Sequence, residues 1–209
     1  MKEDGFTLVE IVIVLVIVGL LLGGILKGQE LIVQARIKNA IADFSGTTAA
    51  YYGYQDRYHA IPGDDPGAAR WAGATAGDGD RIVEGAYNAP AGAVESRLWW
   101  DHLRRAGFVQ GSGERQPFNA LAGIVGVQSG DGAGASTLGG LSRLIVCSTN
   151  LPDKIAGAVD AQMDDGDGTT GTVRALAQTA VSPTVDSATA AVAYVESGTN
   201  VYALCREVF

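Results

Sequence analysis

The feature that most constrains this chain is a continuous apolar run close to its N-terminus. Residues 6–26 read FTLVEIVIVLVIVGLLLGGIL, and Glu10 is the only charged side chain among them. A helix of about 20 residues spans about 30 Å, which is the hydrocarbon thickness of a bilayer. In lipid a lone segment satisfies its backbone polar groups only as a helix. The run is therefore predicted to form a helix that crosses a membrane.

The flanks of this run differ from those of an ordinary secretory signal. The run is longer than a typical signal core, and no A-x-A-like cleavage site follows it. The polar residues before it, MKEDG, end at Gly5. A lone carboxylate such as that of Glu10 costs on the order of 3 kcal/mol or more in a membrane and is usually functional. It needs a partner, and one candidate is the amino group that cleavage after Gly5 would create on Phe6.

The string GFTLVE at residues 5–10, followed by the apolar run, resembles the processing signature of type IV pilins and type II secretion pseudopilins. The resemblance covers residues 1–30. It implies that prepilin peptidase, a membrane aspartic peptidase, cuts between Gly5 and Phe6 and N-methylates Phe6. It also implies that Glu10 pairs with the Phe6 amine of a neighbouring subunit, which neutralises the buried charge and sets the stagger between subunits.

The same resemblance implies a structural role and not an enzymatic one. The chain would first be a single-pass inner-membrane protein with its head in the periplasm, and would then join a cell-surface or periplasmic filament. Its partners would be prepilin peptidase, identical or related pilin subunits, and an inner-membrane assembly platform. The sequence does not distinguish a major pilin, a minor pilin and a pseudopilin. It also does not distinguish adhesion, motility, DNA uptake and secretion as the role of the filament.

One alternative from a different class stays open on the sequence alone. The chain could be a membrane-anchored periplasmic binding module whose acidic loops bind calcium, and such a module would be neither cleaved at Gly5 nor polymerised. An enzyme has no support, because the G-x-S-x-G, H-E-x-x-H and Walker sequences are absent. Nucleic acid is not expected to be the main partner, because the net charge is -8 and phosphate binding needs clusters of Lys and Arg.

The chain as a whole is predicted to have an α+β fold of pilin-like organisation. After a cleaved leader at residues 1–5 and a membrane-spanning, filament-core helix at residues 6–26, apolar side chains at helical spacing continue through residues 27–58. This amphipathic continuation is expected to pack on a globular head, residues 59–209, built around a small antiparallel sheet. Within the head, helices are expected at 95–106 and 150–163, and strands at 121–127, 143–148, 172–175, 190–196 and 201–206, the last two as a hairpin.

Two cysteines, Cys147 and Cys205, lie far apart in the head sequence. Two cysteines and two histidines without a C-x-x-C make a poor zinc set. In an oxidising compartment a disulfide is the natural interpretation, and closing a loop of this length would stabilise the head by roughly 4 kcal/mol. The alternative is a pair of buried free thiols.

Acidic, glycine-rich strings occur twice in the head, at residues 78–80 (DGD) and 164–168 (DDGDG). Asp-Gly pairs commonly form tight turns, which is the simpler interpretation. Calcium, which takes six to eight oxygen ligands, is the other, with Asp164, Asp165 and Asp167 as candidate ligands. Neither string continues to the glutamate of an EF-hand loop. No cofactor is required for the filament role, so calcium would be an addition to it.

Overall fold

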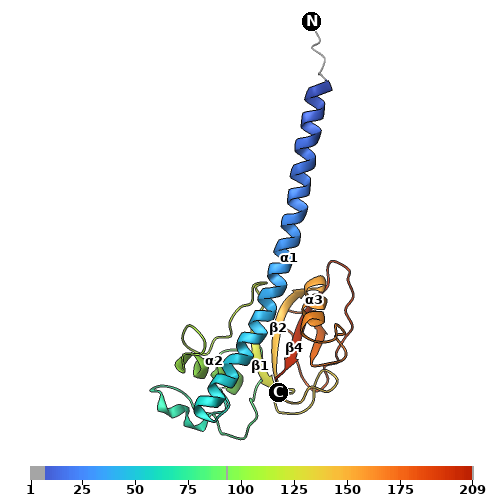
Figure 1. Cartoon of the computed structure of the whole chain (residues 1–209). Helices are drawn as coiled ribbons and strands as arrows, with labels where there is room; N and C mark the ends of the chain where they lie inside the picture. The colour runs from blue at the N-terminus through green and yellow to red at the C-terminus, as the bar shows by residue number, and fades with distance from the viewer. Residues whose placement is uncertain (1–7, 93, 209) are drawn as a thin grey trace. The chain divides into compact units, whose positions relative to one another are not determined.

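The computed structural model describes residues 8–92 and 94–208 (Figure 1). Gly5 and Phe6, the predicted processing residues, lie outside this part of the chain. The chain divides into two compact units, residues 1–36 and residues 37–209. Helix α1 (Leu8–Tyr58) contributes to both units.

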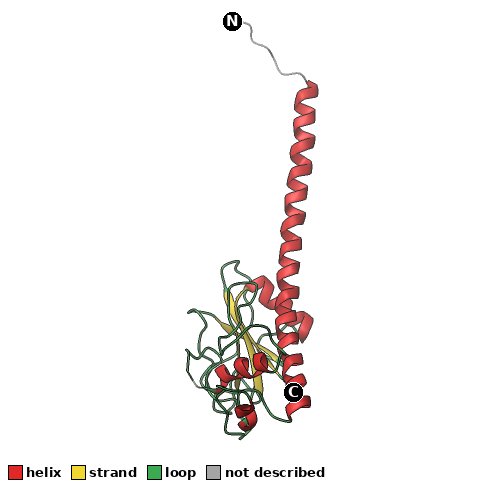
Figure 2. Cartoon of the chain, turned by 90° about the vertical axis from the view of Figure 1, so that its left-hand side faces the viewer, coloured by secondary structure: helices red, strands yellow, loops and turns green. Residues whose placement is uncertain are grey.

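The first unit consists, in its described part, of the N-terminal portion of α1 (Figure 2, red). Proline is absent from residues 8–58, so nothing in the sequence interrupts the helix. Every large apolar side chain from Leu8 to Leu26 is at least 45% exposed. Such a helix is apolar all round and has no core of its own to pack on, as predicted for a membrane span.

The second unit combines the rest of α1 with short helices and one sheet. Helix α1 ends where His59 takes a left-handed conformation, with φ at 52°, and Pro62 follows. The further elements are the 3-10 helix η1 (Pro66–Arg70), α2 (Glu95–Arg105), β1 (Val125–Ser129), β2 (Leu144–Pro152), α3 (Asp153–Met163), β3 (Val173–Ala177) and β4 (Val201–Glu207).

The four strands form one antiparallel sheet with the order β1-β2-β4-β3. In the centre of the sheet, Cys147 of β2 lies opposite Cys205 of β4. A register shift between Ser148 and Leu151 interrupts the pairing of β2 with β4. Much of the remaining chain is loop, as Figure 2 shows in green. The predicted α+β, pilin-like fold is therefore confirmed.

One face of the sheet packs against helices. Apolar side chains three or four residues apart on α1 form a buried stripe that includes Ile37, Phe44 and Tyr51. They join the same core as Val127, Val146 and the α2 tryptophans, and each large apolar side chain buried there contributes about 1.5–3 kcal/mol. The amphipathic pattern predicted for residues 27–58 thus produces the buried stripe from Ile37 onward.

Loops cover the other face of the sheet. Successive side chains of a strand point to opposite faces, so Ile145 and Cys147 lie away from Val146. They belong to a second buried cluster that contains no helical residue; its members are Tyr87, Leu138, Leu141, Ile145, Cys147, Val185 and Cys205. The sheet is therefore buried on both faces.

The predicted hairpin between residues 190–196 and 201–206 is wrong. Strand β4 is an inner strand, and its two edges pair with β2 and β3. No free edge is left for residues 190–196, which form no strand. Their backbone instead makes single contacts: the Val192 N–H donates to the Ala175 carbonyl at 2.9 Å, and the Val195 N–H donates to the Tyr202 hydroxyl at 2.8 Å.

Two predicted boundaries also shift. Residues 150–152 end strand β2, and α3 begins only at Asp153. Residues 121–124 precede β1, since the side chain of Asn119 holds them in a loop by accepting from the N–H groups of Leu121 and Gly123.

Candidate functional site

The first candidate site lies on the apolar part of α1. Glu10 is in the first helical turn and is exposed, among exposed leucine, isoleucine and valine side chains. By length and composition α1 can cross a membrane: its most apolar 18-residue window has a mean hydropathy of 3.0 and is 0% buried. An apolar surface of this extent needs lipid or other helices around it. Glu10 places a carboxylate on that surface.

Four glycines on the same part of α1 leave its surface open. A Cβ atom added at Gly19, Gly23, Gly24 or Gly28 would meet nothing within 4 Å. The fold of the subunit therefore does not require these glycines. Their spacing repeats the G-x-x-x-G pattern that lets membrane helices approach closely. The pattern suits close contact with another membrane helix.

His102 of α2 has a structural role. Its ring is fully buried, Nδ1 accepts from the Gly63 N–H at 2.9 Å, and Nε2 lies 2.8 Å from the Thr75 carbonyl. Burial lowers the pKa of His102, so the imidazole is neutral with its proton on Nε2. Both ring nitrogens are occupied by backbone groups and hold the 63–75 segment on α2.

Asp65 anchors the chain just after α1. Its Oδ2 accepts from the Tyr54 hydroxyl at 2.5 Å and from Arg70 at 2.7 Å, while Oδ1 accepts from the Gly67 N–H at 2.7 Å and caps η1. Burial alone would raise the pKa of Asp65, but the hydrogen bonds from Arg70 and Tyr54 outweigh it and hold the pKa below its usual value. Sequence inspection did not single out this residue.

A first acidic group contains Asp64, Asp78 and Asp80. Asp64 is buried, and its two oxygens accept from the N–H groups of Gly79 at 2.5 Å and Arg81 at 2.8 Å. Asp78 and Asp80 each accept from the N–H two residues further on. Backbone amides therefore account for this group, in keeping with tight-turn chemistry.

A second acidic group lies at the C-terminal end of α3. It consists of Asp160, Asp164 and Asp165, each with one carboxylate oxygen within 4.8 Å of the others. Asp167 is not in this group, and its Oδ1 accepts from the N–H and hydroxyl of Thr169. The structure thus brings two of the three predicted calcium ligands together with a residue that the sequence analysis missed. The available signal was spacing, since Asp160 precedes Asp164 by one helical turn.

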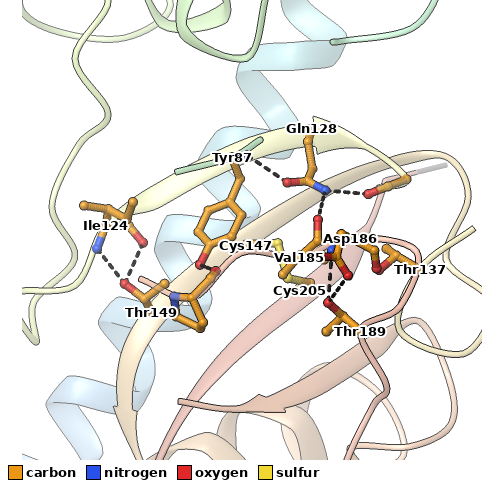
Figure 3. The surroundings of a disulfide bond; sticks show 12 residues. Tyr87, Ile124, Gln128, Thr137, Cys147, Thr149, Val185, Asp186, Thr189 and Cys205 are labelled. Atoms are coloured by element: carbon orange, nitrogen blue, oxygen red, sulfur yellow. Dashed lines mark hydrogen bonds between the residues drawn. A yellow bond between two sulfur atoms is a disulfide. The ribbon is translucent and has the colours of Figure 1, made fainter. Parts of the chain in front are cut away.

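Cys147 and Cys205 form a disulfide, as predicted from the cysteine count. Both residues are fully buried on the loop-covered face of the sheet. Figure 3 shows the side chains that hold residues 183–186 over the disulfide. The Tyr87 hydroxyl donates to the Pro183 carbonyl at 2.5 Å, and the Gln128 amide donates to the Val185 carbonyl at 2.9 Å. The disulfide has a structural position and lies in no open site.

Comparison with known families matches residues 1–26 to the prokaryotic N-terminal methylation motif, the signal of type IV pilins and pseudopilins. No curated protein and no solved structure matches the chain. The matched residues include the string at 5–10 and the apolar part of α1. The motif indicates a pilin-like precursor and a structural subunit, and it implies processing by prepilin peptidase and assembly into pilin filaments.

Proposed function

We propose that this chain is a structural subunit of a type IV pilus-like or type II secretion pseudopilus filament. The observation that carries the proposal is the methylation motif at residues 1–26, which from Leu8 onward lies on a helix whose apolar side chains are exposed on every side. In this proposal prepilin peptidase cuts between Gly5 and Phe6 and methylates the new amino group. The mature subunit then begins with Phe6.

The apolar part of α1 serves two successive environments. Before assembly it lies in the inner membrane with the head in the periplasm, and lipid covers its side chains. After assembly the same side chains pack against the helices of neighbouring subunits in the filament core. A lone membrane helix and a helix inside a bundle of helices need the same apolar surface, so transfer between the two costs little.

Glu10 gives the assembled state its register. A carboxylate is costly in an apolar environment unless a cation lies close by. The methylated amine of Phe6 in a neighbouring subunit supplies that cation in the proposed filament. Glu10 is the only acidic residue in the predicted span, so one position along the helix satisfies both charges. This pairing fixes how far one subunit is shifted along the next.

The test is the intact mass of the protein purified from membranes of cells with and without prepilin peptidase. Loss of residues 1–5 and gain of one methyl group, only where the peptidase is present, is expected. Gly5→Leu should block this change, because in the family that this chain resembles the peptidase cuts after a small residue. Gly19→Ala is the matched control, since a Cβ at Gly19 has open space and should leave processing unchanged.

The opposite result is equally informative. A full-length, unmethylated chain in both kinds of cell would contradict the proposal. The head would then be better studied as a membrane-anchored periplasmic binding module.

A further inference from the structure

Asp43 places a carboxylate on α1 that its own subunit leaves without a partner. The residue is half-buried, and its Oδ2 is closed off from solvent without a hydrogen bond. Among the described residues no ion pair involves this carboxylate. Burial raises the pKa of Asp43, and no neighbouring cation opposes that effect. A charged group in this position is costly unless a cation is brought to it.

The helix that carries Asp43 supplies no such cation. Side chains three and four residues apart face the same side of a helix. At these positions around Asp43 stand Asn39, Ala40, Gly46 and Thr47, none of which is charged. The Thr47 hydroxyl donates at 2.8 Å to the backbone carbonyl of Asp43 and not to its carboxylate. A partner for the carboxylate therefore has to come from outside this helix.

Lys38 is an exposed cation on the same helix, and no ion pair involves it among the described residues. It stands five residues before Asp43, which places the two side chains about 140° apart around the helix. Lys38 and Asp43 of one chain therefore lie on different sides of α1. Two different surfaces that complement each other form a heterologous contact, which repeats from copy to copy in a filament.

We propose that Lys38 of one subunit forms an ion pair with Asp43 of the next subunit along the filament. This inference rests on the proposed function, since it needs a filament in which copies of α1 lie side by side. The partner surface is thus a second copy of this chain. Opposite charge selects it, because an exposed cation on one side of α1 meets an uncompensated carboxylate on the other.

The register proposed for Glu10 also brings the two residues to nearly the same level. Pairing of Glu10 with the Phe6 amine of a neighbour shifts that neighbour by four residues, or about 6 Å along α1. Because α1 is one uninterrupted helix, the same shift brings the neighbour's Lys38 level with Ala42, next to Asp43. Side chains of a helix tilt toward its N-terminus, so the Asp43 carboxylate leans toward that level. One register therefore satisfies both pairs of charges.

The experiment measures sheared filament against processed subunit in membranes of cells that carry charge variants. Lys38→Glu brings two carboxylates together, and Asp43→Lys brings two amines together. Each should lower the filament yield at least about threefold, which is near the lower end of coupling between residues in contact. The double variant reverses the pair and should recover most of the yield. A merely structural role of either residue predicts no recovery.

Urea unfolding of each purified variant identifies those whose head still folds. Lys38→Glu changes an exposed position and tests the pairing even where the half-buried Asp43→Lys variant fails to fold. In that case Asp43→Asn takes its place: it removes the repulsion that Lys38→Glu creates and should raise the yield of that variant. Arg36→Glu, at an exposed cation two residues earlier, is the matched control, and Asp43→Lys should not improve its yield.

The outcomes separate the ion pair from the filament role. Normal filament yield from Lys38→Glu, or no recovery in a folded double variant, would overturn the ion pair while the assembly of the unaltered chain still supports the filament. Recovery of Arg36→Glu by Asp43→Lys would overturn the choice of Lys38. An unaltered chain that is neither processed nor assembled would overturn the proposed function and the ion pair with it.

Discussion

Glu10 stands in the first turn of α1 among exposed apolar side chains, and in the proposed filament its carboxylate pairs with the Phe6 amine of a neighbouring subunit. We predict that Glu10→Gln, which keeps the size and removes the charge, is inserted and cleaved normally but yields at least about tenfold less filament, since a lost buried ion pair costs several kcal/mol. Sheared filament material, quantified against processed subunit in membranes, measures this ratio.

Glu30→Gln is the control for Glu10. Glu30 is an exposed carboxylate on the same helix, and its ion pair with Lys27 at 2.6 Å is worth at most about 1 kcal/mol. Normal filament yield is therefore expected from Glu30→Gln. Normal filament yield from Glu10→Gln as well would eliminate the pairing of Glu10 with the Phe6 amine.

Asp65 links the stability of the head to pH. Hydrogen bonds from Arg70 and Tyr54 hold the pKa of Asp65 in the folded head below its usual value, so the ionised form is favoured by folding. The stability that it contributes is fully present above the unfolded pKa and is lost as pH falls through the folded pKa. We predict that Asp65→Asn lowers the free energy of unfolding at pH 7 by about 1.5–3 kcal/mol, the range for hydrogen bonds to a charged group. This difference should shrink as pH falls below about 4.

Urea unfolding of the full chain in micelles, followed by tryptophan fluorescence between pH 7 and pH 3, measures this difference. All three tryptophans, Trp71, Trp99 and Trp100, lie in the head, so the signal reports on it. Asp56→Asn, at an exposed position on α1, is the control. A gap between the unaltered chain and Asp65→Asn that stays constant over the whole pH range would show that the ionised carboxylate is not the source of the stability.

At the scale of elements, the sequence predicted what depends on local periodicity. The uninterrupted apolar run and the stripe from Ile37 to Tyr54 follow from side chains at helical spacing, and both lie on α1. The hairpin at 190–196 was wrong because pairing depends on which strand edges are free, and β4 has none. Alternating apolar residues show that a segment can form a strand. They do not show whether a neighbouring strand has a free edge with which it can pair.

The acidic group at the C-terminal end of α3 shows the same difference between features with a local sequence signal and features that depend on contacts distant in sequence. Asp164 and Asp165 stand out in the sequence as part of an acidic string, whereas Asp160 lies inside a helix pattern and carries no local signal of burial. Its burial arises from contacts distant in sequence, including the Tyr194 hydroxyl 34 residues away. The loops over the disulfide also depend on contacts between distant residues, since the hydrogen-bonded Tyr87 and Pro183 are 96 residues apart. Such contacts form only when the whole head is assembled.

At the scale of the whole molecule, the disulfide between Cys147 and Cys205 joins the two central strands under a cover of loops. Residues 178–200 form neither helix nor strand in the structure, and they are held by side-chain hydrogen bonds, by single backbone hydrogen bonds and, at Val185 and Ala191, by packing in the cluster around the sulfurs. A crosslink over 58 residues removes about 4 kcal/mol of chain entropy from the unfolded state. The same crosslink holds in place the buried sulfurs on which these loops pack.

We predict that Cys147→Ala with Cys205→Ala lowers the free energy of unfolding of the head by about 2–5 kcal/mol. Amide exchange should rise most in residues 183–189, because Val185 loses its packing against the sulfurs. Urea unfolding and hydrogen exchange of the full chain in micelles measure the two effects. Unaltered chain that is reduced while unfolded and then refolded under reducing conditions is the control, since it lacks the crosslink but keeps both side chains. Equal loss of stability in both would assign the effect to the crosslink. A larger loss in the double variant would assign the excess to packing of the two side chains. No loss in either would refute a stabilising role for the disulfide.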